Sequence, residues 1–163
     1  MIVVDTSAFI SLTAARTLDV FLEEFDIHTT ETVIEELEDV AQYSDETASH
    51  AEQVLDSRDR ITVHDIETAE FQSSRIDDGE GSCIQLTRNT NADFLITDDL
   101  RALPELQTLT ETRIAISPIV LKALVQRNVL EREEALTRLE EAAEQRDWLN
   151  APIYRKAREL FDQ

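Results

Sequence analysis

Short apolar segments recur along the first 116 residues, and a helix-type pattern separates each of them from the next. This alternation constrains the fold most, because repeated strand–helix–strand units build a parallel sheet with helices on both faces. The expected strands are residues 2–4, 26–29, 61–64, 94–97 and 113–116. The sequence therefore predicts an α/β fold with a parallel sheet of about five strands.

Helices are expected in the connections between these strands. Asp45 suits the N-cap of one of them, and the turn Asp77-Asp78-Gly79 caps another. The expected helices begin near Ser7 and span residues 18–25, 30–43, 45–55, 71–75 and 80–88.

The pattern changes to all helix from Ser117 onward. Pro118 suits the first turn of a helix, residues 131–147 form a charged amphipathic helix, and Asn150-Ala151-Pro152 begins a last one. The charge changes as well. Residues 117–163 carry eight basic and nine acidic groups, whereas residues 1–116 carry seven basic and 26 acidic groups. We therefore expect a domain over residues 1–116 and a helical extension, 117–163, docked on the same core.

The net charge of −20 is an unusual feature of the composition. The basic residues are 13 Arg and only two Lys, and surfaces of this kind resemble those of proteins from cytosols rich in potassium salt, where screening mutes self-repulsion. A basic protein partner is the rival interpretation. Because the chain has neither an apolar run of about 18 residues nor a signal-peptide pattern at its start, we expect a cytoplasmic protein that does not enter a membrane.

Acidic residues occupy the predicted strand ends and helix starts in four separate segments. In a parallel sheet these positions meet at one edge, where crowded carboxylates raise one another's pKa unless a cation joins them. Hard divalent cations such as Mg²⁺ or Mn²⁺ suit such oxygen ligands. A chance arrangement is the competing interpretation, because 35 of 163 residues are acidic. The acidic positions are Asp5, Glu35 or Glu36, Glu80, and Asp98 or Asp99.

At these positions the sequence resembles the PIN-domain nucleases. The resemblance covers residues 1 to about 116 and rests on Val3-Val4-Asp5-Thr6-Ser7, Glu36-Leu37, Gly79-Glu80-Gly81-Ser82-Cys83-Ile84 and Ile96-Thr97-Asp98-Asp99. It implies a small parallel α/β sheet, metal-dependent cleavage of RNA and often a homodimer. Many members of the family are toxins of toxin–antitoxin pairs, so the resemblance also implies an antitoxin partner.

The resemblance implies a role for each acid. Asp5 would be a metal ligand, Glu80 the third acid and Asp99 the fourth, with adjacent Asp98 able to replace Asp99 as a ligand. Glu36 would be a ligand or would act through one, and Glu35 is the weaker candidate for that place. The implied catalytic set is Asp5, Glu36, Glu80 and Asp99, and the implied cofactor is Mg²⁺ or Mn²⁺.

Hydroxyl groups accompany these acids. Thr6, Ser7 and Thr97 would hold the carboxylates or bind phosphate. The sequence departs from the family in two ways: the third acid is Glu where many toxins have Asp, and the helical extension matches no part of the family's core pattern that we can identify.

Basic residues gather near the end of the chain. Arg146, Arg155, Lys156 and Arg158, with Trp148 and Tyr154, would contact RNA by phosphate binding and stacking. The preferred alternative is a solvated helix face whose two aromatic rings pack on the core.

Other residues fit no catalytic pattern. His28, His50 and His64 show no metal-binding spacing, and the single cysteine, Cys83, fits a small buried position on a helix. A catalytically silent PIN-like interaction module is the main rival function. Phosphoacceptor receivers and phosphohydrolases of the D-x-D type fit poorly, because Thr6 follows Asp5 and Ser117 stands where the receiver's Lys would be.

Overall fold

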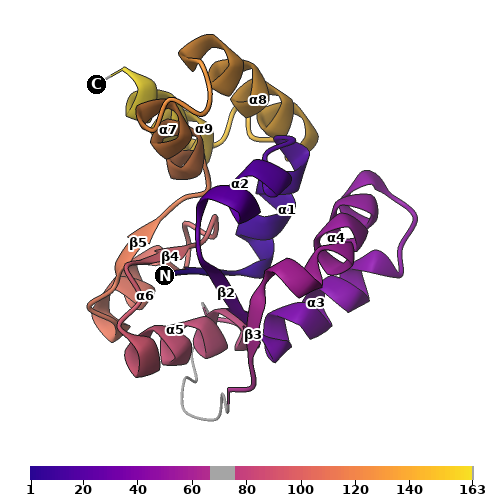
Figure 1. Cartoon of the computed structure of the whole chain (residues 1–163), viewed down its shortest axis with the longest axis vertical. Helices are drawn as coiled ribbons and strands as arrows, with labels where there is room; N and C mark the ends of the chain where they lie inside the picture. The colour runs from indigo at the N-terminus through magenta and orange to yellow at the C-terminus, as the bar shows by residue number, and fades with distance from the viewer. Residues whose placement is uncertain (67–75, 163) are drawn as a thin grey trace.

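A computed structural model of the chain describes residues 1–66 and 76–162, and its centre is a parallel sheet of five short strands (Figure 1). The strand order is β3-β2-β1-β4-β5, which confirms the α/β fold predicted from the sequence. The strands are β1 (Ile2–Val4), β2 (Ile27–Thr30), β3 (Thr62–His64), β4 (Phe94–Ile96) and β5 (Arg113–Ala115).

Strand β1 is the central strand, paired in parallel with β2 on one side and β4 on the other. Its Val3 and Val4 are fully buried, as expected for a strand covered on both faces. The chain runs outward from β1 through β2 to β3, then returns to β4 beside β1. The order therefore reverses between β1 and β4, and ligands of open α/β sheets bind outside the carboxyl ends of the strands at such a point.

Helices connect the strands and cover the sheet. Helix α5 packs on β1, β2 and β4, whereas Figure 1 shows α1 and α2 on the other side of the sheet. The sequence did not predict α6 or the short 3-10 helix η1, and the expected helix over residues 71–75 lies outside the described residues. The elements between β1 and β5 are α1 (Thr6–Ala14), α2 (Leu18–Glu24), α3 (Glu31–Ala41), α4 (Glu46–Asp56), η1 (Arg58–Arg60), α5 (Asp78–Thr90) and α6 (Leu103–Leu109).

Three further helices follow β5 and gather at one end of the molecule: α7 (Pro118–Gln126), α8 (Arg132–Gln145) and α9 (Pro152–Phe161) (Figure 1). Helix α7 packs against α8 and α9, and α8 packs against α1. Leu139 of α8 and Phe9 of α1 belong to one buried apolar cluster that also includes the sheet. None of the described helices has the length and apolar character needed to cross a membrane.

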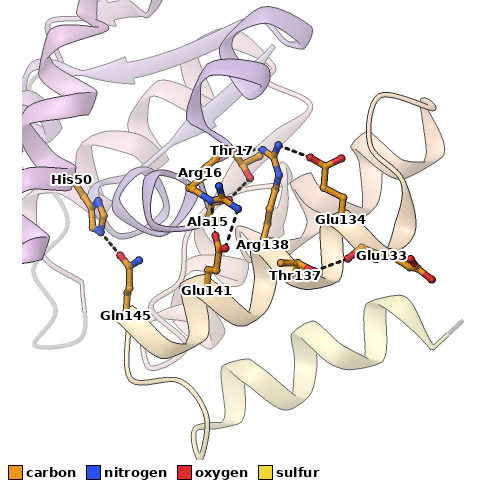
Figure 2. Close-up of polar contacts among 10 residues, drawn as sticks. All are labelled: Ala15, Arg16, Thr17, His50, Glu133, Glu134, Thr137, Arg138, Glu141 and Gln145. Atoms are coloured by element: carbon orange, nitrogen blue, oxygen red, sulfur yellow. Dashed lines mark hydrogen bonds and ion pairs between the residues drawn. The ribbon is translucent and has the colours of Figure 1, made fainter.

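Polar contacts add to this packing between α8 and the rest of the protein (Figure 2). Arg16, just after α1, binds Glu141 through two hydrogen bonds of 2.6 and 2.9 Å. Arg138 donates to the backbone carbonyl of Arg16, just beyond the C-cap of α1, at 2.6 Å. His50 of α4 contacts Gln145 at 2.6 Å. Helix α8 is thus tied to both α1 and α4.

We predict that Leu139→Ala destabilises the whole chain in one step. Leu139 is 1% exposed, so its truncation should cost about 2–5 kcal/mol of unfolding free energy. Urea denaturation followed by circular dichroism and by Trp148 fluorescence should give coincident transitions at a lower midpoint. Leu149→Ala, at an exposed position, is the control and should change the midpoint little. Separate transitions for the two probes would contradict a shared core.

Candidate functional site

A pocket of about 240 Å³ opens where the sheet order reverses. Five carboxyl side chains, two hydroxyl side chains, one isoleucine and one arginine line it. They are Asp5, Thr6, Ser7, Ile10, Glu36, Asp77, Glu80, Asp99 and Arg146. The structure therefore brings the four acidic segments singled out in the sequence to a single pocket.

Asp5 sits between the end of β1 and the start of α1, and it caps that helix. Its Oδ1 accepts hydrogen bonds from the Ala8 amide at 3.1 Å and from the Ser7 hydroxyl at 2.9 Å. The side chain is 4% exposed, and this burial raises its pKa to about 7, although hydrogen bonds from Thr97, Ala8 and Ser7 favour the charged form. Asp5 is therefore held rigidly and is costly to ionise.

Glu36 enters the pocket from α3, whereas neighbouring Glu35 is exposed. The Thr6 hydroxyl donates to Glu36 Oε1 at 3.2 Å. Burial and then the charge of Asp77 raise the pKa of Glu36 to about 7. A Cβ atom on Gly79 would lie 1.7 Å from Glu36 Oε1, so the missing side chain at Gly79 makes the space for this carboxylate.

Glu80 and Asp77 form a capping box at the start of α5. Glu80 N donates to Asp77 Oδ1 at 2.8 Å, and Asp77 N donates to Glu80 Oε2 at 3.2 Å. Burial, followed by a hydrogen bond with Asp99 and the charge of Asp77, raises the pKa of Glu80 to about 9. At neutral pH the metal-free Glu80 therefore keeps its proton and shares it with Asp99.

Asp98 and Asp99 diverge at the end of β4. Asp99 lines the pocket, and its Oδ1 accepts from the amides of Arg101 and Ala102 at 3.0 and 3.4 Å. The Asp98 carboxylate instead accepts from the Ser117 amide and hydroxyl, each at 2.7 Å, and does not line the pocket. Asp98 thus joins the end of β4 to the start of α7.

The three hydroxyls expected to orient carboxylates each contact one. Thr6 bonds Glu36, while Ser7 and Thr97 bond Asp5. Thr97 Oγ1 also accepts from the Asp99 amide at 3.3 Å. These contacts fix the positions of carboxylates that come from different strands.

The basic residues of the extension separate into two groups. Arg146 lines the pocket, but Arg155, Lys156 and Arg158 do not. Lys156 lines a different hollow, near β5 and α9, and Arg158 pairs with Glu140 at 3.3 Å. Trp148 is buried, and the Tyr154 hydroxyl bonds Glu140, as expected if the rings pack on the protein.

Two features of the structure were missed in the sequence. Asp77 lines the pocket although it looked like a simple helix cap; the spacing of Asp77 and Glu80 is the capping-box signal that would place it there. His28 and His64 stack with ring nitrogens 2.9 Å apart, because β2 and β3 are neighbours in the sheet. The histidine pair lies outside the pocket. Cys83 is buried on α5, as predicted.

The side chains of the pocket suit a hard divalent cation in their chemistry. Every candidate ligand is a carboxyl or hydroxyl oxygen. Burial, with smaller contributions from neighbouring acids, raises the pKa of Asp5, Glu36 and Glu80, and a bound cation would offset the cost of ionising them. Within residues 1–66 and 76–162, no three acidic, histidine or cysteine side chains already form a preassembled ligand set.

We predict that Asp5→Asn changes the pH dependence of stability. Because burial raises the pKa of Asp5 from 3.8 to about 7, its stabilising contribution is complete below about pH 4 and is lost as the pH rises through 7. Between these two pH values the unfolding free energy of the wild type should fall by about 1.4 kcal/mol per pH unit because of Asp5, and Asp5→Asn should not show this fall. Urea denaturation of metal-free protein across this range measures it. Exposed Asp39→Asn is the control, and parallel wild-type and Asp5→Asn curves would contradict the assignment.

Comparison with known proteins adds one result to this geometry. A family model described as a PIN domain matches residues 1–163. The match therefore includes the C-terminal helices, which we had expected to lie outside the family's pattern. No curated protein and no solved structure matches the sequence.

Proposed function

Because the chain belongs to the PIN-domain family, whose members are generally nucleases, we propose that it is a metal-dependent endoribonuclease. RNA would be its substrate, and a water molecule activated by Mg²⁺ or Mn²⁺ would cleave the phosphodiester.

A single observation carries this proposal. Asp5, Glu36, Glu80 and Asp99 come from four separate segments, yet they line one pocket at the point where the sheet order reverses. Chance placement of acids would scatter them over the surface, where their charges are well solvated. Two of them, Asp5 and Glu80, are instead about 95% buried despite the electrostatic cost.

Each acid receives a role from its position. Asp5, Glu80 and Asp99 would hold the cation, which when bound lowers the pKa of water and neutralises charge on the phosphate. Glu36, held by Thr6, would orient the attacking water or complete the ligand set. Asp98 would position Asp5 and Asp99 rather than ligate, because its carboxylate is occupied by Ser117.

The family also supports finer proposals about partners. The chain would act as the toxin of a toxin–antitoxin pair, would be held by an antitoxin protein and would form a homodimer in the cytoplasm. Light scattering of the purified protein tests the dimer directly.

We predict that purified protein cuts single-stranded RNA with Mn²⁺ and stops with EDTA. Asp5→Asn should lower the rate at least about 100-fold, because it removes a charge from the site that stabilises the reaction. Glu36→Gln should also lower it, whereas Glu35→Gln, with the same chemical change on an exposed neighbour, should not. If Asp5→Asn cuts as fast as wild type, this mechanism is wrong.

Gly79→Ala tests the space around Glu36. The added Cβ would displace the Glu36 carboxylate, which is the end of a flexible side chain, so the fold should survive while cleavage falls about tenfold or more. Thermal unfolding and cleavage rate, measured on the same sample, separate the two effects. Unchanged cleavage in this variant would mean that the place of Glu36 is not critical.

A silent interaction module is the second candidate. The net charge of −20 and the helical extension, both suited to contact with a protein partner, favour it. Calorimetry in which Mn²⁺ fails to bind near neutral pH, together with isolation of a stable protein partner, would select it over the nuclease.

A further inference from the structure

Among the described residues that line the acidic pocket, Arg146 is the one with a basic side chain. It follows α8 and so belongs to the C-terminal helices, whereas the carboxyl groups come from the sheet edge, α3 and α5. Its side chain donates a hydrogen bond to Ser11, which is 135 residues away in the sequence. The extension therefore contributes a charged group to a pocket built by the rest of the chain.

The backbone at Arg146 is firmly placed. Its amide donates to the Ala142 carbonyl at 2.8 Å, and the Trp148 amide donates to the Ala143 carbonyl at 2.8 Å, which closes the end of α8. Trp148 is buried just beyond it, with Asp147 between them in the left-handed region at φ 56°. These bonds fix the Cα of Arg146 at the end of α8.

The side chain is anchored through a single nitrogen. Arg146 Nε donates to the Ser11 hydroxyl at 3.2 Å, and this hydroxyl donates to the Ser7 carbonyl at 3.0 Å. Ser7 in turn bonds Asp5. The guanidinium is thus joined through two serines to the carboxylate at the centre of the pocket.

The guanidinium makes no ion pair with any carboxylate of residues 1–66 and 76–162. Burial lowers its pKa, while the charges of Asp98 and Asp5 act in the opposite direction from a longer range. An arginine left unpaired beside so many acids has donors to offer to an anion. Its planar set of N–H groups matches the oxygens of a phosphate.

We propose that Arg146 binds a non-bridging oxygen of the substrate phosphate, so that the C-terminal helices complete the nuclease site. The proposal rests on the proposed function and names the substrate contact of the same pocket. The acids alone repel the RNA backbone, and a positive group fixed at the rim would hold the phosphate beside Asp5. In this account Arg146 is a binding residue, and Ser11 is a positioning residue that acts through it.

The test compares RNA binding by Arg146→Gln and by Arg113→Gln, which removes the same charge from an exposed site outside the pocket. Fluorescence anisotropy of a short labelled single-stranded RNA, with Ca²⁺ replacing Mn²⁺ to suppress cleavage, gives the affinity. Arg146→Gln should weaken binding about tenfold, as expected for one charge-assisted contact. It should also reduce the slope of log affinity against log salt by about 0.7, the value for one phosphate on a single strand.

Further variants separate binding from folding. Arg146→Lys keeps the charge without the planar donors and should recover part of the affinity. Ser11→Ala should lose part of the affinity, while Arg113→Gln should keep nearly all of it. Thermal unfolding of each variant shows that the comparison is made on folded protein.

Three results would overturn the proposal: Arg146→Gln binding RNA as tightly as wild type, Arg113→Gln losing as much affinity and slope as Arg146→Gln, or Arg146→Gln binding Mn²⁺ more tightly with unchanged RNA affinity. The last would make Arg146 an internal counter-ion of the acids. Cleavage by wild type is scored separately, so a protein that binds RNA through Arg146 without cutting it would refute the nuclease function alone.

Discussion

The electrostatic cost of placing carboxyl groups together in a poorly solvated pocket governs this structure. Asp5 and Glu80 are almost completely buried, and Glu36, Asp77 and Asp99 line the same small space. The fold lowers the cost in two ways. Amide and hydroxyl donors support the charge of Asp5, and a retained proton joins Glu80 to Asp99. Ionising these carboxyl groups costs free energy unless a cation is bound. The arrangement therefore indicates a cation-binding site rather than a solvated surface.

The carboxyl groups of the pocket are positioned by the ends of short strands and the starts of helices. Strand β1 is three residues long and central, so its end lies beside the ends of β2 and β4. The start of α1 receives Asp5 as its cap, and the capping box of α5 points Glu80 toward the pocket. Helix α8 is fixed on α1 by Arg16 and Arg138, which also determines where the end of α8 lies (Figure 2).

Much of this arrangement follows from the sequence, because apolar runs that end in acids give both the strands and the edge at which they meet. Val3-Val4-Asp5 is the clearest case. The strand boundaries shift by about one residue, since strand ends depend on pairing that the chain alone does not show. Helix α6 was missed, although Pro104 suits its first turn, because its seven residues carry too short a periodic pattern.

Details that depend on tertiary contacts were beyond sequence reasoning. The Asp98 carboxylate is held by Ser117, which lies between β5 and α7, and this leaves Asp99 to face the pocket. The local sequence around Asp98 and Asp99 does not show this contact. The entry of Arg146 into the pocket depends on how α8 docks, over a separation of 135 residues. The pairing of His28 with His64 depends on strand order in the same way.

The most direct measurement of the central claim is calorimetric titration of Mn²⁺ into metal-free protein near pH 7, in buffers of different ionisation enthalpy. If the pocket's carboxyl groups share a cation, binding must release about one proton or more per ion, because Asp5, Glu36 and Glu80 then hold protons that ligation displaces. Asp5→Asn should weaken this binding sharply. Binding without proton release, equally strong in Asp5→Asn, would show that these acids do not form one metal-binding pocket.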